Sequence, residues 1–477
     1  MTERRRRQRP DAPPAAAKFA GATGRLTLPQ RMILLVIGTS LLWLVATVSL
    51  PAALADFSPD AALWLKPNHS RALLNKAEQS RRLLLDALKD TQESAQTAAL
   101  DFTRSAPPVA PDAKAARATE IEARRSEIRA AALRVLRQEP LNARALTLLG
   151  EVAVNSTEAR NYMEAAVKRS RGETRAVAWL LNDSFQRKDF VAAIRFADIL
   201  MRTSPNLRPL ATAFLASASN DDQGRSALAT HLTDPVNADI RRMFFQLLPR
   251  SVSASATSHA IMTAVKGLGA PPMVAELKPY LDDLIAKKDV DAAYFAWLDL
   301  MPPGELSAVG LINNGDFERE FSGLPFDWRI ASPLNATVDV VPASQTSGRT
   351  IVIRFGSGRV RFPTLSQLTM LPAGRYRLSV KHRGDVSAKR GLRWRIRCFG
   401  KPQPPIGETD MILGRQLDWL TVVVDFEVPA TPECRAQQVA LIHDARSASE
   451  ELISGEAWFD AVAIEALPAP ALTTPPL

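Results

Sequence analysis

Arginine alternates with apolar residues in three short stretches of the C-terminal third of the chain. The alternation is that of a β-strand, in which every second side chain lies on the same face of a sheet. Around Arg393, for example, Trp394 and Ile396 would take the opposite face. The arginines in this pattern are Arg359, Arg361, Arg375, Arg377, Arg393, Arg395 and Arg397. If the three strands lie side by side, they form one arginine-covered face.

Such a face could bind an anionic ligand, because a guanidinium group donates paired hydrogen bonds to carboxylate, sulfate or phosphate. Between Arg349 and Lys401 there are fourteen Lys or Arg residues and one acidic residue, Asp385. Rows of like charge repel unless anions meet them. Those anions could be internal, since Asp425 and Glu427 alternate along another predicted strand. Both interpretations stay open: a face for an acidic polysaccharide, or arginines paired within the sheet.

The chain has only two cysteines, Cys398 and Cys434, and both fall in this C-terminal third. A chain with two cysteines is neither a disulfide-dense scaffold nor a Cys-rich zinc protein. We expect the two to form a disulfide in an oxidising compartment. The alternative is a pair of buried free thiols.

No catalytic motif is present in the sequence. A nucleophile elbow, a phosphate-binding Walker loop and an H-E-x-x-H motif are all absent. The five histidines share no short metal spacing with each other or with the cysteines: His69, His231, His259, His382 and His443. A carboxylate pair for glycoside hydrolysis has no sequence spacing by which to recognise it. We therefore expect a binding protein rather than an enzyme, with no cofactor beyond a structural calcium ion.

The secondary structure that the sequence predicts changes from helix to strand along the chain. From about residue 309, period-two alternation and Gly/Pro turns predict an all-β sandwich over 309–467. The predicted strands are 351–355, 359–362, 376–380, 394–398, 421–426 and 458–464. A Pro-rich tail, 468–477, follows.

Three segments of this region resemble the galactose-binding-like jelly rolls found among carbohydrate-binding modules. They are the opening 311–318 (LINNGDFE) followed by Trp328, the turn 371–376 (LPAGRY), and the final strand 457–464 (AWFDAVAI). The resemblance covers about residues 309–467 and implies a β-sandwich. It also implies sugar binding, although the same sandwich serves structural roles.

In some members of that family, residues at the positions of Asn314, Asp316 and Glu318 lie near a structural calcium ion. Carboxylate and carbonyl oxygens suit such a cation. The alternative is that Asn314-Gly315 forms a turn, Phe317 enters the core and Glu318 is solvated.

Helical periodicity dominates residues 56–300, with a Pro-rich linker near 105–118. Predicted helices include 157–169, 175–186 and 190–202. Segment RALTLLG at Arg144 aligns with RAVAWLL at Arg175, an offset of 31 residues. Paired helices at this spacing resemble degenerate tetratricopeptide repeats, which implies a surface for partner proteins. The alternative is an irregular helical bundle.

The N-terminal region predicts membrane insertion. Residues 1–31 carry eight basic and two acidic side chains and form a basic arm, and 32–55 carries no charge. This arrangement predicts a single-pass transmembrane signal anchor with the N-terminus in the cytoplasm. The alternative is a signal peptide cleaved after Ala55, because Ala53-Leu54-Ala55 is an A-x-A pattern.

The composition fits a globular envelope protein: 46% of residues are apolar, and the net charge is +10. Only 14 of the 60 basic residues are Lys, a bias common in bacteria with GC-rich genomes. The leading hypothesis is a scaffold or binding protein of the bacterial inner membrane, with its bulk in the periplasm. It would bind envelope proteins and an acidic polysaccharide, in polysaccharide assembly or export. A glycan-active enzyme and a protein-only scaffold are the alternatives; nucleic acid does not suit the compartment.

Overall fold

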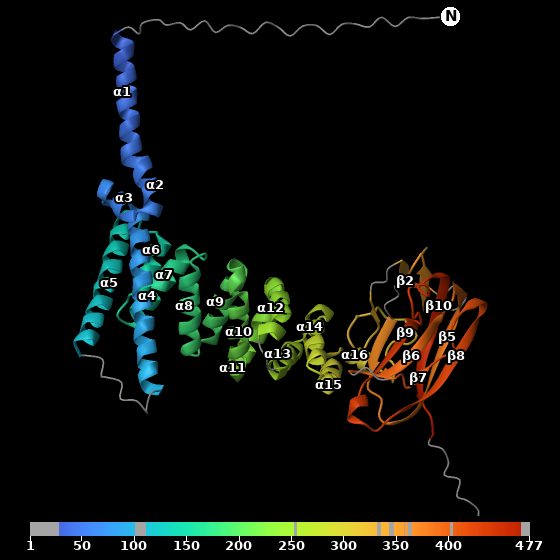
Figure 1. The fold of residues 1–477 in the computed structure, drawn as a ribbon. Coiled ribbons are helices and arrows are strands. Elements are labelled where there is room, and N and C mark those ends of the chain that lie inside the picture. The colour runs from blue at the N-terminus through green and yellow to red at the C-terminus, as the bar shows by residue number, and fades with distance from the viewer. Residues whose placement is uncertain are drawn as a thin grey trace, which may run out of the picture. The chain divides into compact units, whose positions relative to one another are not determined.

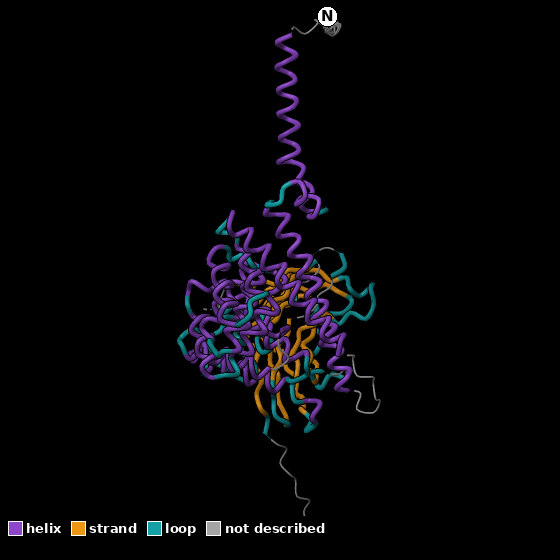
Figure 2. The backbone as a smooth tube through the Cα atoms, turned by 90° about the vertical axis from the view of Figure 1, so that its left-hand side faces the viewer, coloured by secondary structure: helices purple, strands orange, loops and turns teal. Residues whose placement is uncertain are grey.

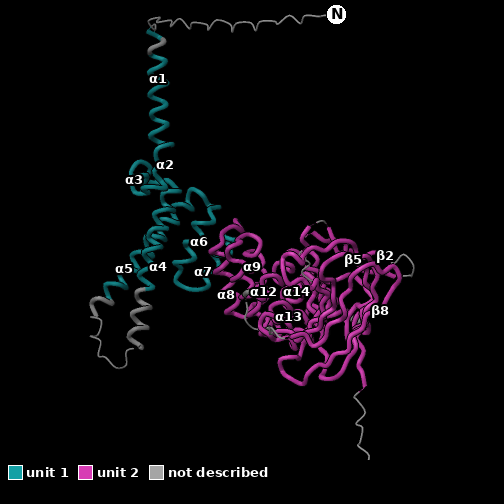
Figure 3. The backbone as a smooth tube through the Cα atoms, turned by 45° about the vertical axis from the view of Figure 1, so that its right-hand side comes forward, with its two compact units in different colours: residues 1–169 teal, residues 170–477 magenta. Residues whose placement is uncertain are grey.

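The computed structural model describes residues 28–100, 111–251, 255–331, 335–342, 348–356, 358–360, 365–400 and 404–468. Helices form the N-terminal part, and the strands all lie after residue 328 in a two-sheet antiparallel sandwich (Figure 1; orange in Figure 2). This is the predicted fold class. The chain divides into two compact units, 1–169 and 170–477 (Figure 3).

The first unit begins with a long apolar helix. It runs through α1 (Leu28–Leu44), a π-helical turn (Val45–Ser49) and α2 (Leu50–Phe57). The segment Met32–Phe57 is long and apolar enough to cross a membrane, a test that a signal sequence near the N-terminus also passes. The predicted basic arm lies outside the described residues, apart from 28–31.

Four further helices and the short α3 complete this unit: α3 (Pro59–Leu65), α4 (Ser70–Leu100), α5 (Pro111–Gln138), α6 (Ala143–Glu151) and α7 (Ser156–Arg169). The core lies between α4, α5 and α6, where Leu73, Ile128 and Leu148 are buried together. The linker predicted near 105–118 is wrong from residue 111 onward, because α5 begins there. Pro111 is its first residue, a position where proline leaves no extra N–H unpaired.

The second unit begins with helical hairpins in chain order (Figure 1). They are α8 (Thr174–Gln186), α9 (Phe190–Thr203), α10 (Arg208–Ala218), α11 (Asp222–Thr233), α12 (Ala238–Ser251), α13 (Ser255–Gly267), α14 (Val274–Ala286) and α15 (Val290–Leu300), followed by the short α16 (Pro303–Leu306). Helices α10, α12 and α14 form one layer, since α10 packs on α12 and α12 on α14. Helices α9, α11 and α13 form the second layer. The predicted boundaries for α7, α8 and α9 agree within a residue.

Two of these hairpins share the same tight turn. Lys188 and Lys288 adopt a left-handed backbone, with φ of 58° and 64°. In each case the next residue, Asp189 or Asp289, caps the following helix. Its carboxylate accepts the backbone N–H of the third residue of that helix. Our sequence alignment missed this shared Lys-Asp turn, and an internal repeat stays a prediction. Membership in the tetratricopeptide family stays a prediction.

Among the described residues, ten strands make two five-stranded sheets. The first sheet has the order β1-β4-β9-β6-β7, and the second sheet has the order β2-β3-β10-β5-β8. The strands are β1 (Arg329–Ile330), β2 (Ala336–Pro342), β3 (Arg349–Phe355), β4 (Leu365–Thr369), β5 (Gly374–Ala388), β6 (Leu392–Cys398), β7 (Gly407–Glu408), β8 (Gly414–Val428), β9 (Gln437–His443) and β10 (Ile453–Ala466). Buried aromatic rings, among them Trp328, Trp394 and Phe459, fill the space between the sheets.

Candidate ligand-binding face

The predicted arginine strands do not lie side by side. Strand β5, which carries Arg375 and Arg377, belongs to the second sheet, whereas β6, with Arg393, Arg395 and Arg397, belongs to the first. The expectation of one arginine-covered face is therefore wrong, because sequence alternation assigns a face within a strand but does not choose its neighbours. Arg359 forms an isolated β-bridge with Leu452 outside the named strands, and Arg361 lies outside the described residues.

On the first sheet, carboxylates surround the arginines. We call this group the arginine–carboxylate cluster: Arg390, Arg393, Arg395, Glu408 and Asp444. Arg393 lies 2.7 Å from Glu408 and 3.5 Å from Asp444, and Arg395 lies 3.3 Å from Asp444. Arg395 also pairs with Glu408, and Arg390 with Asp444.

Asp444 is the shared anion of this cluster and is buried. Burial acts to raise its pKa, but the hydrogen bond from Arg390 and the charges of Arg393 and Arg395 outweigh it. The pKa of Asp444 is therefore below its ordinary value. Arg397, at the exposed end of β6, donates to the side chain of Gln438 at 2.9 Å. Internal pairing thus holds for Arg393 and Arg395, through partners other than Asp425 and Glu427, which the internal alternative names.

On the second sheet, Arg377 pairs with Asp425, as the internal alternative predicted. Two hydrogen bonds of 2.7 and 2.9 Å join them across β5 and β8, and they lower the pKa of Asp425. Arg375 lies opposite Glu427 in the same ladder, and its side chain is exposed.

A different arginine of β5 meets aromatic rings instead. The guanidinium carbon of Arg383 lies 4.9 Å from the ring centroid of Trp419 and 4.9 Å from that of Trp458. These three side chains come from adjacent strands β8, β5 and β10 and occupy the outer face of the second sheet. We call them the indole–guanidinium row. Arg354 of β3 extends it, at 6.0 Å from Trp458.

The row combines apolar ring faces with a cation, an arrangement that cation–π attraction stabilises. All three side chains are half-buried, so each keeps accessible surface. The sequence-based predictions named none of them as site residues. The available signal was the period of two along β5, which places Arg383 on the same face as Arg375 and Arg377.

The predicted calcium residues lie in a tight loop before β1. Asn314 accepts the Arg319 N–H and donates to the Arg319 carbonyl, and Glu318 accepts the Arg349 N–H. Phe317 is fully buried in the core. A side chain at Gly315 would clash with the Val462 carbonyl, at 1.9 Å, so the loop packs directly on β10.

These contacts agree with the alternative interpretation, in which Asn314-Gly315 forms a turn and Phe317 enters the core. Asn314 does not fit as a calcium ligand, because both polar atoms of its amide are already bonded to Arg319. Among the described residues, no three His, Cys, Asp or Glu side chains group to hold a metal ion. Asp316 and Glu318 do lie near Asp460 of β10, whose pKa is raised by burial and by those two charges. Calcium binding by this loop stays a prediction.

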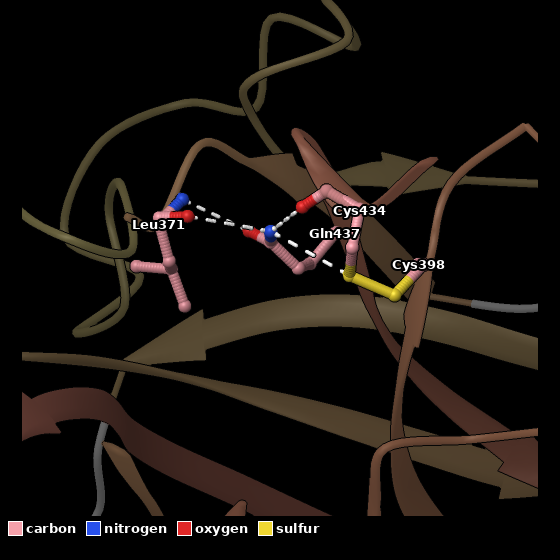
Figure 4. The surroundings of a disulfide bond; sticks show 4 residues. All are labelled: Leu371, Cys398, Cys434 and Gln437. Carbon is pink, nitrogen blue, oxygen red and sulfur yellow. Dashed lines mark hydrogen bonds between the residues drawn. A yellow bond between two sulfur atoms is a disulfide. The ribbon is translucent and has the colours of Figure 1, made fainter. Parts of the chain in front are cut away.

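Cys398 and Cys434 form the predicted disulfide. It joins the end of β6 to the short 3-10 turn Pro432–Cys434 that precedes β9. The buried amide of Gln437 donates to the Cys434 carbonyl at 2.6 Å and accepts the Leu371 N–H at 2.9 Å (Figure 4). The bridge and this amide therefore tie three segments together at one end of the first sheet.

The sequence matches no protein-family model and no curated protein. Solved structures that resemble part of the chain include the carbohydrate-binding module CBM4 (16% identity, 33% of this chain and 99% of that one, TM-score 0.24). A second is TmCBM61 in complex with β-1,4-galactotriose (17%, 33% and 99%, TM-score 0.22). A third is a Stig cyclase from Fischerella sp. TAU (15%, 33% and 97%, TM-score 0.23).

Identities and TM-scores this low carry no argument about what this chain binds. The three structures include both carbohydrate-binding modules and a cyclase. The case for a ligand therefore depends on the geometry of the face itself.

Proposed function

We propose that the protein is anchored in a bacterial inner membrane by its first helix and that its sandwich binds an acidic polysaccharide. In this proposal the helical region, in the periplasm, binds partner proteins of the cell envelope. The sandwich acts by binding rather than by catalysis. Assembly or export of a surface polysaccharide is the process in which such a protein would serve.

The indole–guanidinium row is the observation that supports polysaccharide binding by the sandwich. Indole rings offer flat apolar faces on which the C–H face of a sugar ring can lie, with the N–H edge left polar. The guanidinium of Arg383 supplies the charge that a uronate or sulfate group needs.

Packing around Ala55 supports an anchor that is retained rather than cleaved. Ala55 is fully buried against Ala62 and Ala72, and its carbonyl accepts a hydrogen bond of 2.9 Å from Asn75. Next to it, Asp56 pairs with Arg71 at 2.5 Å. Ala55, the last residue of the A-x-A pattern, is thus packed within the folded domain, and cleavage after it would remove this packing.

A groove in the helical region supports the binding of partner proteins. It has a volume of about 750 Å³ and lies between α9 and α11. Val191 in its wall is 73% exposed, and Asp222 and His231 supply polar groups beside it. A surface that mixes an exposed apolar residue with hydrogen-bonding groups suits a protein segment.

The polysaccharide part is tested with two variants of one strand. Arg383→Ala removes the guanidinium beside the two indole rings, and Arg377→Ala is the matched control, because Arg377 is an arginine of the same strand and face that lies outside the indole–guanidinium row. We expect alginate, a polyuronate, to be retained by the native protein and by Arg377→Ala, and retention by Arg383→Ala to fall at least tenfold. Retention should weaken as salt rises, because exposed charges are screened within about 10 Å at 0.1 M.

Trp458→Ala should reduce retention as strongly as Arg383→Ala does, with the melting temperature nearly unchanged. Neutral dextran serves as the ligand control. Equal retention of alginate by all the variants, or no retention by the native protein at low salt, would contradict the proposal.

Membrane topology is tested separately. A reporter enzyme that is active only in the periplasm, fused after Leu477, should be active. The protein recovered from membranes should still carry residues before Asp56. An inactive but well-expressed fusion would reject the orientation, and mature protein beginning at Asp56 would reject the retained anchor.

A further inference from the structure

Two aromatic side chains at the end of the apolar helix are almost fully exposed. Phe57, the last residue of α2, is 90% exposed, and Trp64 of α3 is 83% exposed. Helix α3 packs against α2 and lies beside the end of the long helix (Figure 1). Aromatic rings carry a large apolar area, so two nearly bare rings this close in the chain indicate a surface that something else covers.

A third exposed apolar side chain, Leu141, lies at the same end of the first unit. It is 75% exposed and follows the last residue of α5 by three positions. The end of α5 is held next to the connection between α3 and α4, because Arg134 of α5 donates a hydrogen bond to the Pro67 carbonyl. We call these three side chains the anchor-end surface: Phe57, Trp64 and Leu141.

The length of the apolar segment sets the depth of this surface. If the hydrocarbon core of a bilayer begins at Met32, after Arg31, the helix crosses about 30 Å in about twenty residues and leaves the core near Ala52. Phe57 lies five residues further along, about 7–8 Å, and so within the headgroup layer, which is about 5–8 Å thick on each side. Tilting the helix would bring Phe57 deeper. Because α3 packs against α2 and α4, Trp64 is held close to Phe57 in depth.

The polar groups around the anchor-end surface suit the same layer. Tryptophan is enriched at membrane–water interfaces, because its ring is apolar and its N–H is polar. The acidic side chains nearby are paired: Asp56 lies 2.5 Å from Arg71. Asp60 lies 2.7 Å from Lys76. Lys66 follows α3, is exposed and adds a cation that can reach the lipid phosphates.

We propose that the anchor-end surface lies in the interfacial layer of the bilayer, on the side where the helix emerges, among the glycerol and upper acyl groups of the lipids. This inference rests on the proposed function, because it takes the apolar helix as a membrane anchor. It adds that the first unit is held against the membrane by three side chains from separate elements. Since Ala55, Ala62 and Ala72 pack α2, α3 and α4 together, these contacts fix the direction in which α4 leaves the membrane.

Single cysteines that carry a fluorophore test this surface in the full-length protein, reconstituted into phospholipid nanodiscs whose two faces are open to solution. The native cysteines are bridged, so each new thiol is the only one that reacts. Trp64→Cys and Leu141→Cys report the anchor-end surface, and Leu141→Cys leaves both aromatic rings in place. Leu42→Cys, inside the apolar segment, reports the anchor itself.

Val154→Cys is the matched control. Val154 is 83% exposed, like Trp64, but lies away from the anchor end. Its N–H donates to Glu158, which pairs with Arg129, nine residues before the last residue of α5. Along α5 this is about 14 Å from the anchor end, beyond the headgroup layer.

We expect a lipid nitroxide placed near the headgroups to quench the Trp64→Cys and Leu141→Cys labels more than a nitroxide placed near the bilayer centre does. The Leu42→Cys label should show the reverse order. Iodide, which stays in the water, should quench the Val154→Cys label several-fold more strongly than the other three. All the replaced side chains are exposed, so each variant should melt at the native temperature.

Iodide quenching of the Trp64→Cys or Leu141→Cys label as strong as that of Val154→Cys would overturn the inference. The proposed anchor would still stand if the Leu42→Cys label stayed protected. A Leu42→Cys label that iodide reaches would reject the anchor and the inference together. Protection of the Trp64→Cys label from iodide without quenching by either lipid nitroxide would mean that a protein covers the surface, which would also overturn the inference.

Discussion

The two sheets of the sandwich place their arginines in different surroundings. On the first sheet, arginines enclose Asp444 and lower its pKa, and a disulfide fastens the end of β6. On the second sheet, Arg383 stacks on indole rings, and the pKa of Asp460 is raised by burial and by nearby carboxylates. The arginines of β6 thus meet a buried carboxylate, whereas Arg383 of the second sheet meets aromatic rings and Arg377 an exposed carboxylate. Arginine content alone therefore does not identify a binding face.

The largest expected effect comes from the disulfide of the first sheet. Replacing Cys398 and Cys434 together with Ser should lower the free energy of unfolding by about 3–4 kcal/mol, because the bridge closes a long loop in the unfolded chain. Thermal unfolding followed by tryptophan fluorescence measures the loss. Thiol labelling of the denatured, unreduced native protein should find no free thiol; two labelled cysteines would contradict the bridge.

Removing the shared anion of the arginine–carboxylate cluster should have the next largest effect. Asp444→Ala leaves Arg390, Arg393 and Arg395 without that carboxylate, and the expected loss is about 2–3 kcal/mol. The folded-state pKa of Asp444 is lowered, so its contribution is present above the ordinary pKa and is lost as pH falls through the lowered value. The difference in melting temperature between native protein and variant should therefore shrink in acid. A difference independent of pH would mean that Asp444 acts only by packing.

Removing the charge of Asp460 should stabilise the protein at neutral pH, whereas removing Asp444 should destabilise it. The folded-state pKa of Asp460 is raised, so its contribution is favourable below the ordinary pKa of about 4 and is lost as pH rises through the raised value. Asp460→Asn keeps an oxygen that can accept the Ala461 N–H and removes the charge near Asp316 and Glu318. The variant should melt higher than the native protein at pH 7 and lose that advantage below pH 4. If calcium binds to these carboxylates, it should raise the melting temperature of the native protein and not that of the variant.

The smallest expected effect on stability is at the exposed pair Arg377–Asp425. Exposed ion pairs contribute little, because water screens them and two long side chains lose freedom. Arg377→Ala should leave the melting temperature within error of the native value. A clear decrease would mean that the second sheet also depends on internal pairing, and the contrast between the two sheets would then weaken.

Local sequence patterns predicted most of the helices and strands, but they did not predict which strands lie next to each other. The helices around Thr174 and Phe190 and the strands at Ile351 and Trp394 follow from periodicity and caps, which depend on residues close in sequence. Short strands such as β4 and β7 were missed, because a few residues without regular alternation carry little signal. Asp444 was missed as a partner of Arg395, since 49 residues separate them.

The sequence by itself determined the apolar N-terminal helix, the helical hairpins, the sandwich and the cysteine pair. Each of these depends on amino-acid composition, on the period at which apolar residues recur along the chain, or on the number of cysteines. Only the tertiary structure decided that β5 and β6 belong to different sheets, that Glu408 and Asp444 neutralise the arginines of β6, and that Arg383 lies between Trp419 and Trp458. The physical reason is that strand pairing joins segments far apart in the chain. Its choice depends on the packing of both sheets around one core, and no local pattern records that packing.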